Sequence, residues 1–314
     1  ALLRSFTPAA SAGDNTQVPG MDFSIPSDAT PVNIDLDSGG YVDRLYLGDL
    51  GGNVWRFDID SASPTVWTAV KFADLTNGAV PRRKIFFPPA AVKQEFLGQR
   101  FDAIYVGTGD RENPLRSDNV DMMVMIKDFE TGLTSSRTSP VVFSAGTGAT
   151  NFYDLTANLV QFGSAAEKET ARQAIKDTAG WFVRLETGGV AGEKVVNAPS
   201  VFFNVLRFGT YSPLASASAC VPPGKGTTYS MSALDGRIVA DTNHDGVVTS
   251  SDSRSSSDVA KGLISDDALV FRKKASGDGK TMYRTVCVDG VCHLEAIGNV
   301  GAGQRVYWFQ EPEG

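Results

Sequence analysis

The sequence predicts an all-β protein, because short segments of alternating apolar and polar residues recur about every ten residues, with turn-forming residues between them. With 314 residues, 42% of them apolar, the chain can fill a large core. Radial repetition of four-stranded blades accounts for this length better than one sandwich or barrel. We therefore expect a β-propeller domain over residues 31–314, preceded by an irregular lead-in over residues 1–30.

The expected strand 54–59 has two chemically different faces. Trp55 and Phe57 fall on one face, and Arg56 and Asp58 fall on the other. We expect the two aromatic side chains to pack between sheets. A Gly-rich turn at 49–53 joins this strand to 44–48, and further strands are expected at 100–107, 122–127, 227–234, 268–273, 281–286 and 305–309, with two more in 193–206 that are broken at Pro199.

One helix is expected, in an insertion at about 163–179 that ends near Gly180. Ser164 and Glu167 have the spacing of a capping box. The apolar positions form a narrow stripe on a charged segment, which indicates a surface helix. These positions are Ala166, Ala171, Ala174 and Ile175.

The stretch DTNHDGVVTSSD, from Asp241 to Asp252, has the spacing of a twelve-residue calcium loop. Calcium takes about six to eight oxygen ligands, and alternate side chains of such a loop converge on one point. Gly246 permits the sharp turn at the sixth position. The expected ligands are Asp241, Asn243, Asp245, the backbone carbonyl of Val247, Thr249 and Asp252.

The alternative for residues 241–252 is a solvated surface turn, which needs no metal. Calcium is favoured because the loop brings three carboxylates together without a Lys or Arg, and a cation relieves their repulsion. Asp252 is shorter than the usual Glu at position 12, so we expect weak binding, about 10⁻⁴ M, suited to extracellular calcium. Val248 at position 8 is expected to point into the protein.

The overall composition narrows the range of partners. A formal charge of −7 and a pI near 5.0 argue against a nucleic-acid-binding surface, which needs clustered Lys and Arg. The sequence has no run of about 18 apolar residues, so we expect no membrane span. Because the chain begins at Ala1 rather than at a Met, we expect a mature or trimmed piece.

Two of the three cysteines flank a predicted hairpin turn. Cys287 and Cys292 lie on either side of Asp289-Gly290 in the segment VCVDGVC. We expect a disulfide across this turn, contributing about 2 kcal/mol in the chain-entropy model, and hence an oxidising compartment. Two reduced, half-buried thiols are the alternative. Cys220 either pairs with a region outside this chain or stays free.

The segment DLDSGGYVDRLYLGDLGGNVWRFDID resembles the C-terminal domain of type IV pilus biogenesis adhesins of the PilY/PilC family. Those domains share an Asp-rich loop before a strand, a G-D-x-x-G-N-x-W-R-F-D block, a G-W-[FY] segment and a G-E-[KR]-V-V strand. The last two occur here at residues 180–182 and 192–196. The resemblance covers most of residues 31–310 and implies a modified, quinoprotein-like β-propeller on a bacterial surface, at the pilus tip or associated with the outer membrane.

The resemblance also implies a second metal site. A nine-residue calcium loop, D-x-[DN]-x-D-G-x-x-D, commonly carries a regulatory metal in that family. The first Asp-rich loop aligns with it at Asp35, Asp37 and Asp43, but Gly39 replaces the carboxylate of the fifth position. These three carboxylates either bind calcium or cap turns. The implied partners are minor pilins at the pilus tip, or a host or surface receptor.

The leading hypothesis is a calcium-binding, non-enzymatic domain that acts in pilus extension and retraction, twitching motility and surface adhesion. One alternative is a quinoprotein-like dehydrogenase. Against it, the two histidines, His244 and His293, lie in the metal loop and beside the expected disulfide, and the sequence contains no P-loop or nucleophile elbow. The other alternative is a structural module that docks minor pilins.

Overall fold

The computed structural model consists mainly of β-strands, with two α-helices and a 3₁₀ turn, η1 (Pro64–Val66), among the residues it describes. The first strands, β1 (Ser5–Thr7) and β2 (Asn15–Gln17), form a parallel pair. The structure describes residues 4–9, 15–34, 41–132, 139–186, 191–213, 224–243, 247–260, 268–273, 280–288 and 291–300, with the backbone alone from residue 257 onward.

The first sheet has the strand order β10-β6-β5-β4-β3. Its four consecutive strands, β3 to β6, form an antiparallel meander, and β10 joins the edge strand β6 in parallel. The strands are β3 (Thr30–Val32), β4 (Arg44–Gly48), β5 (Asn53–Asp58), β6 (Thr68–Asp74) and β10 (Val141–Val142).

The middle sheet has the order β11-β12-β9-β8-β7. Its first three strands in the chain again form an antiparallel meander, which β12 extends, and β11 pairs with β12 in parallel. The strands are β7 (Ala90–Phe96), β8 (Gln99–Gly107), β9 (Met122–Asp128), β11 (Phe152–Asp154) and β12 (Gly180–Arg184).

The third and fourth sheets are antiparallel. The third has the order β13-β15-β16-β17, with β14 also paired to β15, and the fourth has the order β18-β19-β20. Their strands are β13 (Lys194–Val195), β14 (Ser200–Phe202), β15 (Val205–Pro213), β16 (Gly224–Ser232), β17 (Ser255–Ala260), β18 (Ala268–Lys273), β19 (Lys280–Val288) and β20 (Val291–Val300).

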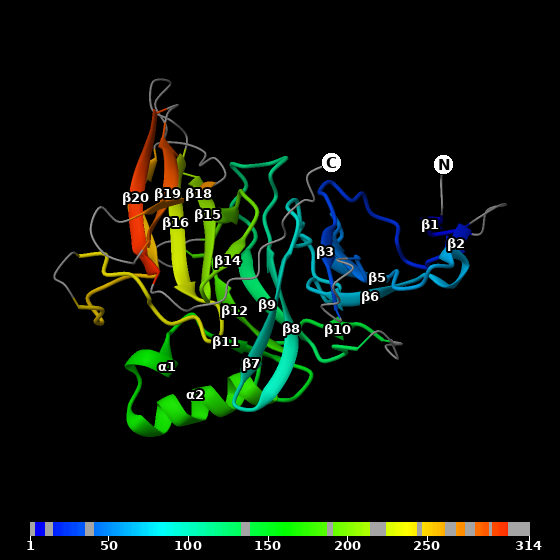
Figure 1. The fold of residues 1–314 in the computed structure, drawn as a ribbon, viewed down its shortest axis with the longest axis horizontal. Coiled ribbons are helices and arrows are strands. Elements are labelled where there is room, and N and C mark those ends of the chain that lie inside the picture. The colour runs from blue at the N-terminus through cyan, green and yellow to red at the C-terminus, as the bar shows by residue number, and fades with distance from the viewer. Residues whose placement is uncertain are drawn as a thin grey trace.

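The middle sheet is buried on both faces, because side chains alternate between two cores along its strands. In β8, Ala103 and Tyr105 pack in a core shared with β15 and β16 of the third sheet. Ile104 and Val106 pack in a separate core shared with β4, β5 and β6 of the first sheet. The first three sheets therefore stack face to face, and in Figure 1 they follow one another across the molecule from blue to yellow.

The outer face of the first sheet is covered by the N-terminal residues. Trp55 and Phe57 of β5 are buried in a third core together with Val18 and Met21. The ring of Phe6 in β1 contacts Phe57 edge to face, with 4.9 Å between ring centroids. The expected core role of the two β5 aromatics is confirmed, and they are covered by Phe6, Val18 and Met21.

The prediction of an all-β fold is confirmed. Face-to-face stacking of consecutive antiparallel meanders is also how propeller blades pack. Across the described ranges, however, the sheets form a row and do not close into a ring. Closure into a propeller therefore stays a prediction. The expected strand 305–309 lies outside the described residues.

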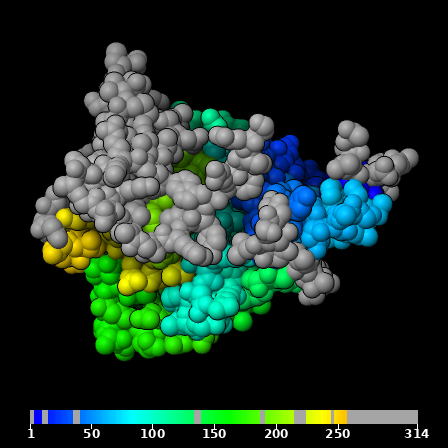
Figure 2. Space-filling view, viewed as in Figure 1, coloured from blue at the N-terminus to red at the C-terminus, as the bar shows by residue number. Residues whose placement is uncertain are grey.

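The predicted helix is confirmed as α2 (Ala165–Asp177), which follows a short helix, α1 (Leu159–Phe162). Ser164 and Glu167 form the expected capping box. The buried stripe consists of Ala171, Ala174 and Ile175. Ala166 was expected in this stripe but is exposed, because it lies about 140° around the helix from Ala171. Figure 2 shows this helical region, in green, at the lower edge of the molecule.

Candidate functional site

The turn between β4 and β5 is organised by one buried carboxylate, Asp49. Its Oδ1 accepts from the backbone amides of Gly51 and Asn53 at 2.8 and 2.9 Å. Its Oδ2 accepts from the Asn53 side-chain amide and from the Trp55 indole, both at 2.8 Å. The Asp, Asn and Trp of the G-D-x-x-G-N-x-W block are thus partners in one hydrogen-bonded turn.

Directly after this turn, β5 contributes to a buried set of charges that we call the interface network: Arg44, Arg56, Asp58, Asp128 and Glu130. Arg44 Nε lies 2.6 Å from Asp58 within the first sheet. Arg56 Nη1 lies 2.7 Å from Asp128 of β9, and Arg56 Nη2 lies 2.5 Å from Glu130. The network therefore joins the first sheet to the middle sheet.

The network is electrostatically tight because both guanidinium groups are buried. Burial alone would lower the pKa of Arg56, but the nearby charges of Asp128 and Asp58 raise it above its usual value. Tyr46 also donates to Asp128, at 2.6 Å, and burial together with that carboxylate raises the pKa of the phenol. The network is thus a structural connection between sheets, since its charges are paired with one another and shielded from solvent.

The G-E-K-V-V segment supplies a second set of buried polar contacts, through Glu193 and Lys194. Glu193 accepts from the hydroxyls of Thr210 and Tyr229, at 2.6 and 2.9 Å. The neighbouring Lys194 is 2% exposed, and its ammonium donates to the carbonyl oxygens of Arg116 and Gly192. Burial lowers the pKa of Lys194. This pair anchors β13 between the third sheet and the β8–β9 connection.

The described part of the predicted calcium loop is closed by Asp252, which is 6% exposed. Its Oδ1 accepts from the backbone amides of Thr242 and Asn243, at 2.8 and 3.2 Å, and from the Thr242 hydroxyl. Its Oδ2 accepts from the Thr249 amide at 2.7 Å. These hydrogen bonds, with that from Thr249 the strongest contributor, lower the pKa of Asp252.

Asp252 was predicted as the twelfth-position calcium ligand. Three of its four hydrogen bonds within the loop converge on Oδ1, and one goes to Oδ2. Each carboxylate oxygen has about two acceptor sites, so Oδ2 keeps one acceptor site beside the hydrogen bond from Thr249. Asp241 and Asn243 lie at the end of one described range, and Val247 and Thr249 lie at the start of the next, whereas Asp245 lies outside the described residues.

The expectation that Val248 points into the protein is wrong. Its side chain is 42% exposed and that of Val247 is 58% exposed. The loop connects β16 to β17 at the surface, where no sheet face covers position 8 among the described residues. An inward position 8 depends on a neighbouring element, which the loop sequence itself does not supply.

Of the three carboxylates predicted to bind calcium in the first Asp-rich loop, only Asp43 lies among the described residues. Asp43 is 8% exposed, and its Oδ2 accepts from the backbone amide of Ile34 at 2.6 Å. Asp43 thus caps the turn in which the loop begins. Asp35 and Asp37 lie outside the described residues, and the second calcium site stays a prediction. No group of three or more His, Cys, Asp or Glu side chains within the described ranges is placed to hold a metal.

The backbone places the two hairpin cysteines opposite each other. Cys287 of β19 pairs in register with Cys292 of β20, and Val288 pairs with Val291. The expected two-residue hairpin connection is therefore confirmed, and the disulfide itself stays a prediction. Cys220 and His244 lie outside the described residues, and His293 lies in β20.

These features define a β-rich domain of stacked sheets whose first hairpin carries an Asp-centred turn and a buried ion-pair network. The crystal structure of the Pseudomonas aeruginosa PilY1 C-terminal domain has this fold, with a TM-score of 0.54 and 16% identity over 86% of this chain and 60% of that chain. A type IV pilus biogenesis factor PilY1 homolog from Xylella fastidiosa (strain Temecula1 / ATCC 700964) is 25% identical over 221 residues. The chain is thus PilY1-like in sequence and in fold.

The curated match covers 65% of this chain but 14% of the relative, so the chain corresponds to a small part of that protein. No protein-family model matches the chain. Among the described residues, no helix is both long enough and apolar enough to cross a membrane.

Proposed function

We propose that this chain is a non-enzymatic surface domain of a type IV pilus biogenesis factor. The observation that carries the proposal is the combined likeness to a PilY1 homolog in sequence and to a PilY1 C-terminal domain in fold. The interface network supports a scaffolding role, because its charges are paired and buried between sheets rather than presented to a substrate. Minor pilins, or a host or surface receptor, are the proposed partners in pilus extension, twitching motility and adhesion.

Calcium is the proposed cofactor of the loop between β16 and β17. Calcium prefers oxygen ligands. These would come from Asp241, Asn243, Asp245, the backbone carbonyl of Val247, Thr249 and Asp252. Because the loop joins two paired strands of the third sheet, binding there would make the stability of that sheet depend on the calcium concentration. Weak binding would match the calcium concentrations found outside cells.

The proposal is tested by removing the domain from the full-length protein. In the bacterium that carries this chain, deletion of residues 31–314 should abolish surface pili and twitching. Pili sheared from the cells are quantified by immunoblot, and the exposed substitution Asp60→Ala serves as the control. If the domain opposes retraction, pili should return in a retraction-deficient strain. Normal piliation and twitching after the deletion would contradict the proposal.

A further inference from the structure

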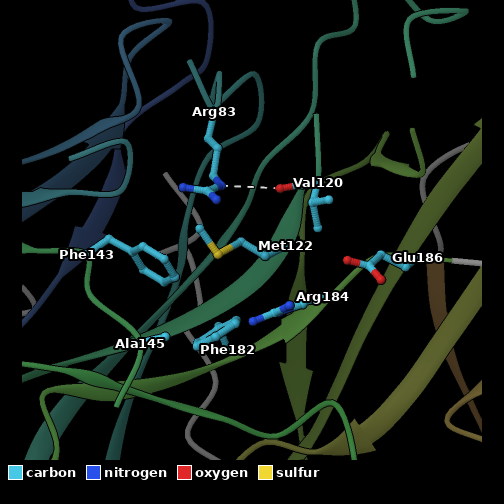
Figure 3. A pocket seen from close by; sticks show the side chains of 8 residues that line it. All are labelled: Arg83, Val120, Met122, Phe143, Ala145, Phe182, Arg184 and Glu186. Carbon is cyan, nitrogen blue, oxygen red and sulfur yellow. Dashed lines mark hydrogen bonds between the residues drawn. The ribbon is translucent and has the colours of Figure 1, made fainter. Parts of the chain in front are cut away.

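A cavity of about 270 Å³ lies where the first and middle sheets meet, beyond the ends of β9 and β12. Figure 3 shows that it combines an apolar floor with charged side chains. The residues used below are Arg83, Met122, Phe143, Phe182, Arg184 and Glu186. None of them belongs to the interface network or to the calcium loop.

The floor of the cavity is formed by packed core side chains. Met122 and Phe182 are each 2% exposed and belong to the core between the first and middle sheets. Phe143 packs against the same core, and its ring contacts Phe182 edge to face at 5.1 Å between centroids. An apolar group entering the cavity would therefore meet a preformed apolar surface.

Arg83 lies over this floor, and two of the three nitrogen atoms of its guanidinium group donate hydrogen bonds within the described residues. Its Nε donates to the carbonyl oxygen of Val120 at 3.2 Å, and Nη1 donates to that of Leu75 at 3.0 Å. The guanidinium carbon lies 5.0 Å from the centroid of the Phe143 ring. In the described part of the chain, Nη2 has no hydrogen-bond acceptor. Because burial removes part of the solvent around its charge, the pKa of Arg83 is lowered.

Arg184 supplies a second guanidinium. Its Nε lies 3.2 Å from Asp154, and its guanidinium carbon lies 5.8 Å from the centroid of the Phe182 ring. Neither of its Nη groups has an acceptor among the described residues. In Figure 3 the guanidinium groups of Arg83 and Arg184 extend toward the same space, and the Glu186 carboxylate faces that space from another wall.

We propose that this cavity binds the C-terminal residue of a protein partner, with its carboxylate between Arg83 and Arg184 and its apolar side chain on the floor. Guanidinium groups pair strongly with carboxylates. Glu186 in the lining and Asp154 beside Arg184 offset part of the positive charge of the two guanidinium groups, which suits a monoanion better than a phosphate. Glu186 can also accept from the ligand's backbone amide. Terminal carboxylate capture is a recurring mode of peptide recognition.

The size of the cavity supports one residue rather than a larger ligand. Sites for drug-sized molecules occupy roughly 300–1,000 Å³, and this cavity is smaller than that range. A chain terminus presents an apolar side chain and a carboxylate from the same Cα atom. An internal Asp or Glu would offer the charge without an apolar group for the Met122 and Phe182 floor.

The test is calorimetric titration of the intact chain with N-acetyl-Gly-Gly-Phe as the free acid and as the C-terminal amide. The free acid should bind at millimolar concentration or below, and the amide at least about tenfold more weakly, because it lacks the charged hydrogen-bond acceptor. N-acetyl-Gly-Gly-Gly should also bind at least about tenfold more weakly, because it leaves the apolar floor uncovered.

Variants locate the site. Arg184→Gln should weaken binding of the free acid at least about tenfold, whereas Arg172→Gln, on the exposed face of α2, should leave it unchanged. Circular dichroism of both variants checks that they are folded. Equal binding of acid and amide, no binding by the parent, or equal binding by Arg184→Gln would overturn the proposal. Equal affinity for 3-phenylpropionate, which lacks the backbone amide, would overturn the chain-terminus part, since a carboxylate with an apolar group would then suffice. The result is independent of calcium and of pilus assembly.

Discussion

Arg56 of β5 and Asp128 of β9 form a 2.7 Å ion pair between two sheets, and both side chains are fully buried. The pair joins positions 72 residues apart in the chain. It lies on the face of β5 opposite Trp55, so this strand packs aromatics on one side and charges on the other. Substituting either residue alone would be costly, because the remaining charge would be buried in a low-dielectric interior without its partner.

Arg56→Met should therefore destabilise the domain by about 3–5 kcal/mol, since it leaves Asp128 and Glu130 buried without their main cation. Urea unfolding followed by tryptophan fluorescence measures the free energy of unfolding. The control is Arg100→Met, which breaks an exposed, solvent-screened ion pair with Glu95 and should leave the free energy of unfolding nearly unchanged.

A double variant, Arg56→Met with Asp128→Leu, separates charge from packing. It should recover part of the lost stability, because Asp128 no longer leaves a buried charge without its cation, whereas Glu130, whose side chain is 18% exposed, still lacks Arg56. A small effect of Arg56→Met alone, no larger than that of the surface control, would show that the network does not hold the sheets together.

Asp121, just before β9, should make stability depend on pH. It is 1% exposed, accepts from the Thr108 hydroxyl at 2.8 Å, and has no hydrogen-bond partner at Oδ2 within the described chain. Burial raises its pKa to about 6. The folded state therefore holds this proton more tightly than the unfolded state does. The contribution of Asp121 to the free energy of unfolding is largest below about pH 4 and is lost as the pH rises to about 6.

Asp121→Asn removes this titration. Between pH 4 and pH 7, the free energy of unfolding of the parent should fall relative to that of the variant by about 2 kcal/mol. Chemical denaturation at both pH values, with Asp60→Asn as an exposed control, measures the difference. If the difference in free energy of unfolding between parent and variant is the same at pH 4 and pH 7, Asp121 is not the group that makes stability depend on pH.

The loop at residues 241–252 should show two separable effects. Asp245→Ala should lower the melting temperature in calcium and leave it almost unchanged in EDTA, because only metal binding is lost. Asp252→Ala should lower it in both conditions, because it also removes the cap on Thr242 and Thr249. Ser250→Ala, whose side chain is exposed, is the control within the loop. Differential scanning calorimetry gives the melting temperatures.

Calcium titration then counts the sites. If Asp245→Ala alone abolishes binding, the chain has one site, whereas loss of one ion in each of Asp245→Ala and Asp37→Ala would establish two. A parent that binds nothing at millimolar calcium, or an Asp245→Ala variant as stable as the parent in calcium, would rule out calcium as the cofactor of this loop.

The register of β19 and β20 leads to a chemical prediction for Cys287 and Cys292. If they form the disulfide, unfolded but unreduced protein should take up one thiol-alkylating label, at Cys220, and reduced protein should take up three. Intact-mass spectrometry reads the count. Three labels without reductant would show that the hairpin thiols are free.

Local sequence predicted most of the strong elements. The capping box at Ser164 and Glu167 located the start of α2, because both groups act within one turn of the helix. Strands β6 and β7 were missed. Each contains a Lys among its apolar residues, in TAVKFAD and AAVKQEF, and so carries a weak alternation signal. Their place is set by backbone pairing with β5 and β8.

The alternation in β5 shows what the sequence can predict about a strand and what it cannot. By itself it determined that Trp55 and Phe57 share one face and Arg56 and Asp58 the other, because side chains alternate across a strand. Only the tertiary structure decided that the charged face is also buried, because Asp128 and Glu130 arrive from a different sheet to neutralise it. Periodicity is a property of neighbouring residues, whereas charge compensation in a core depends on contacts between residues far apart in the chain.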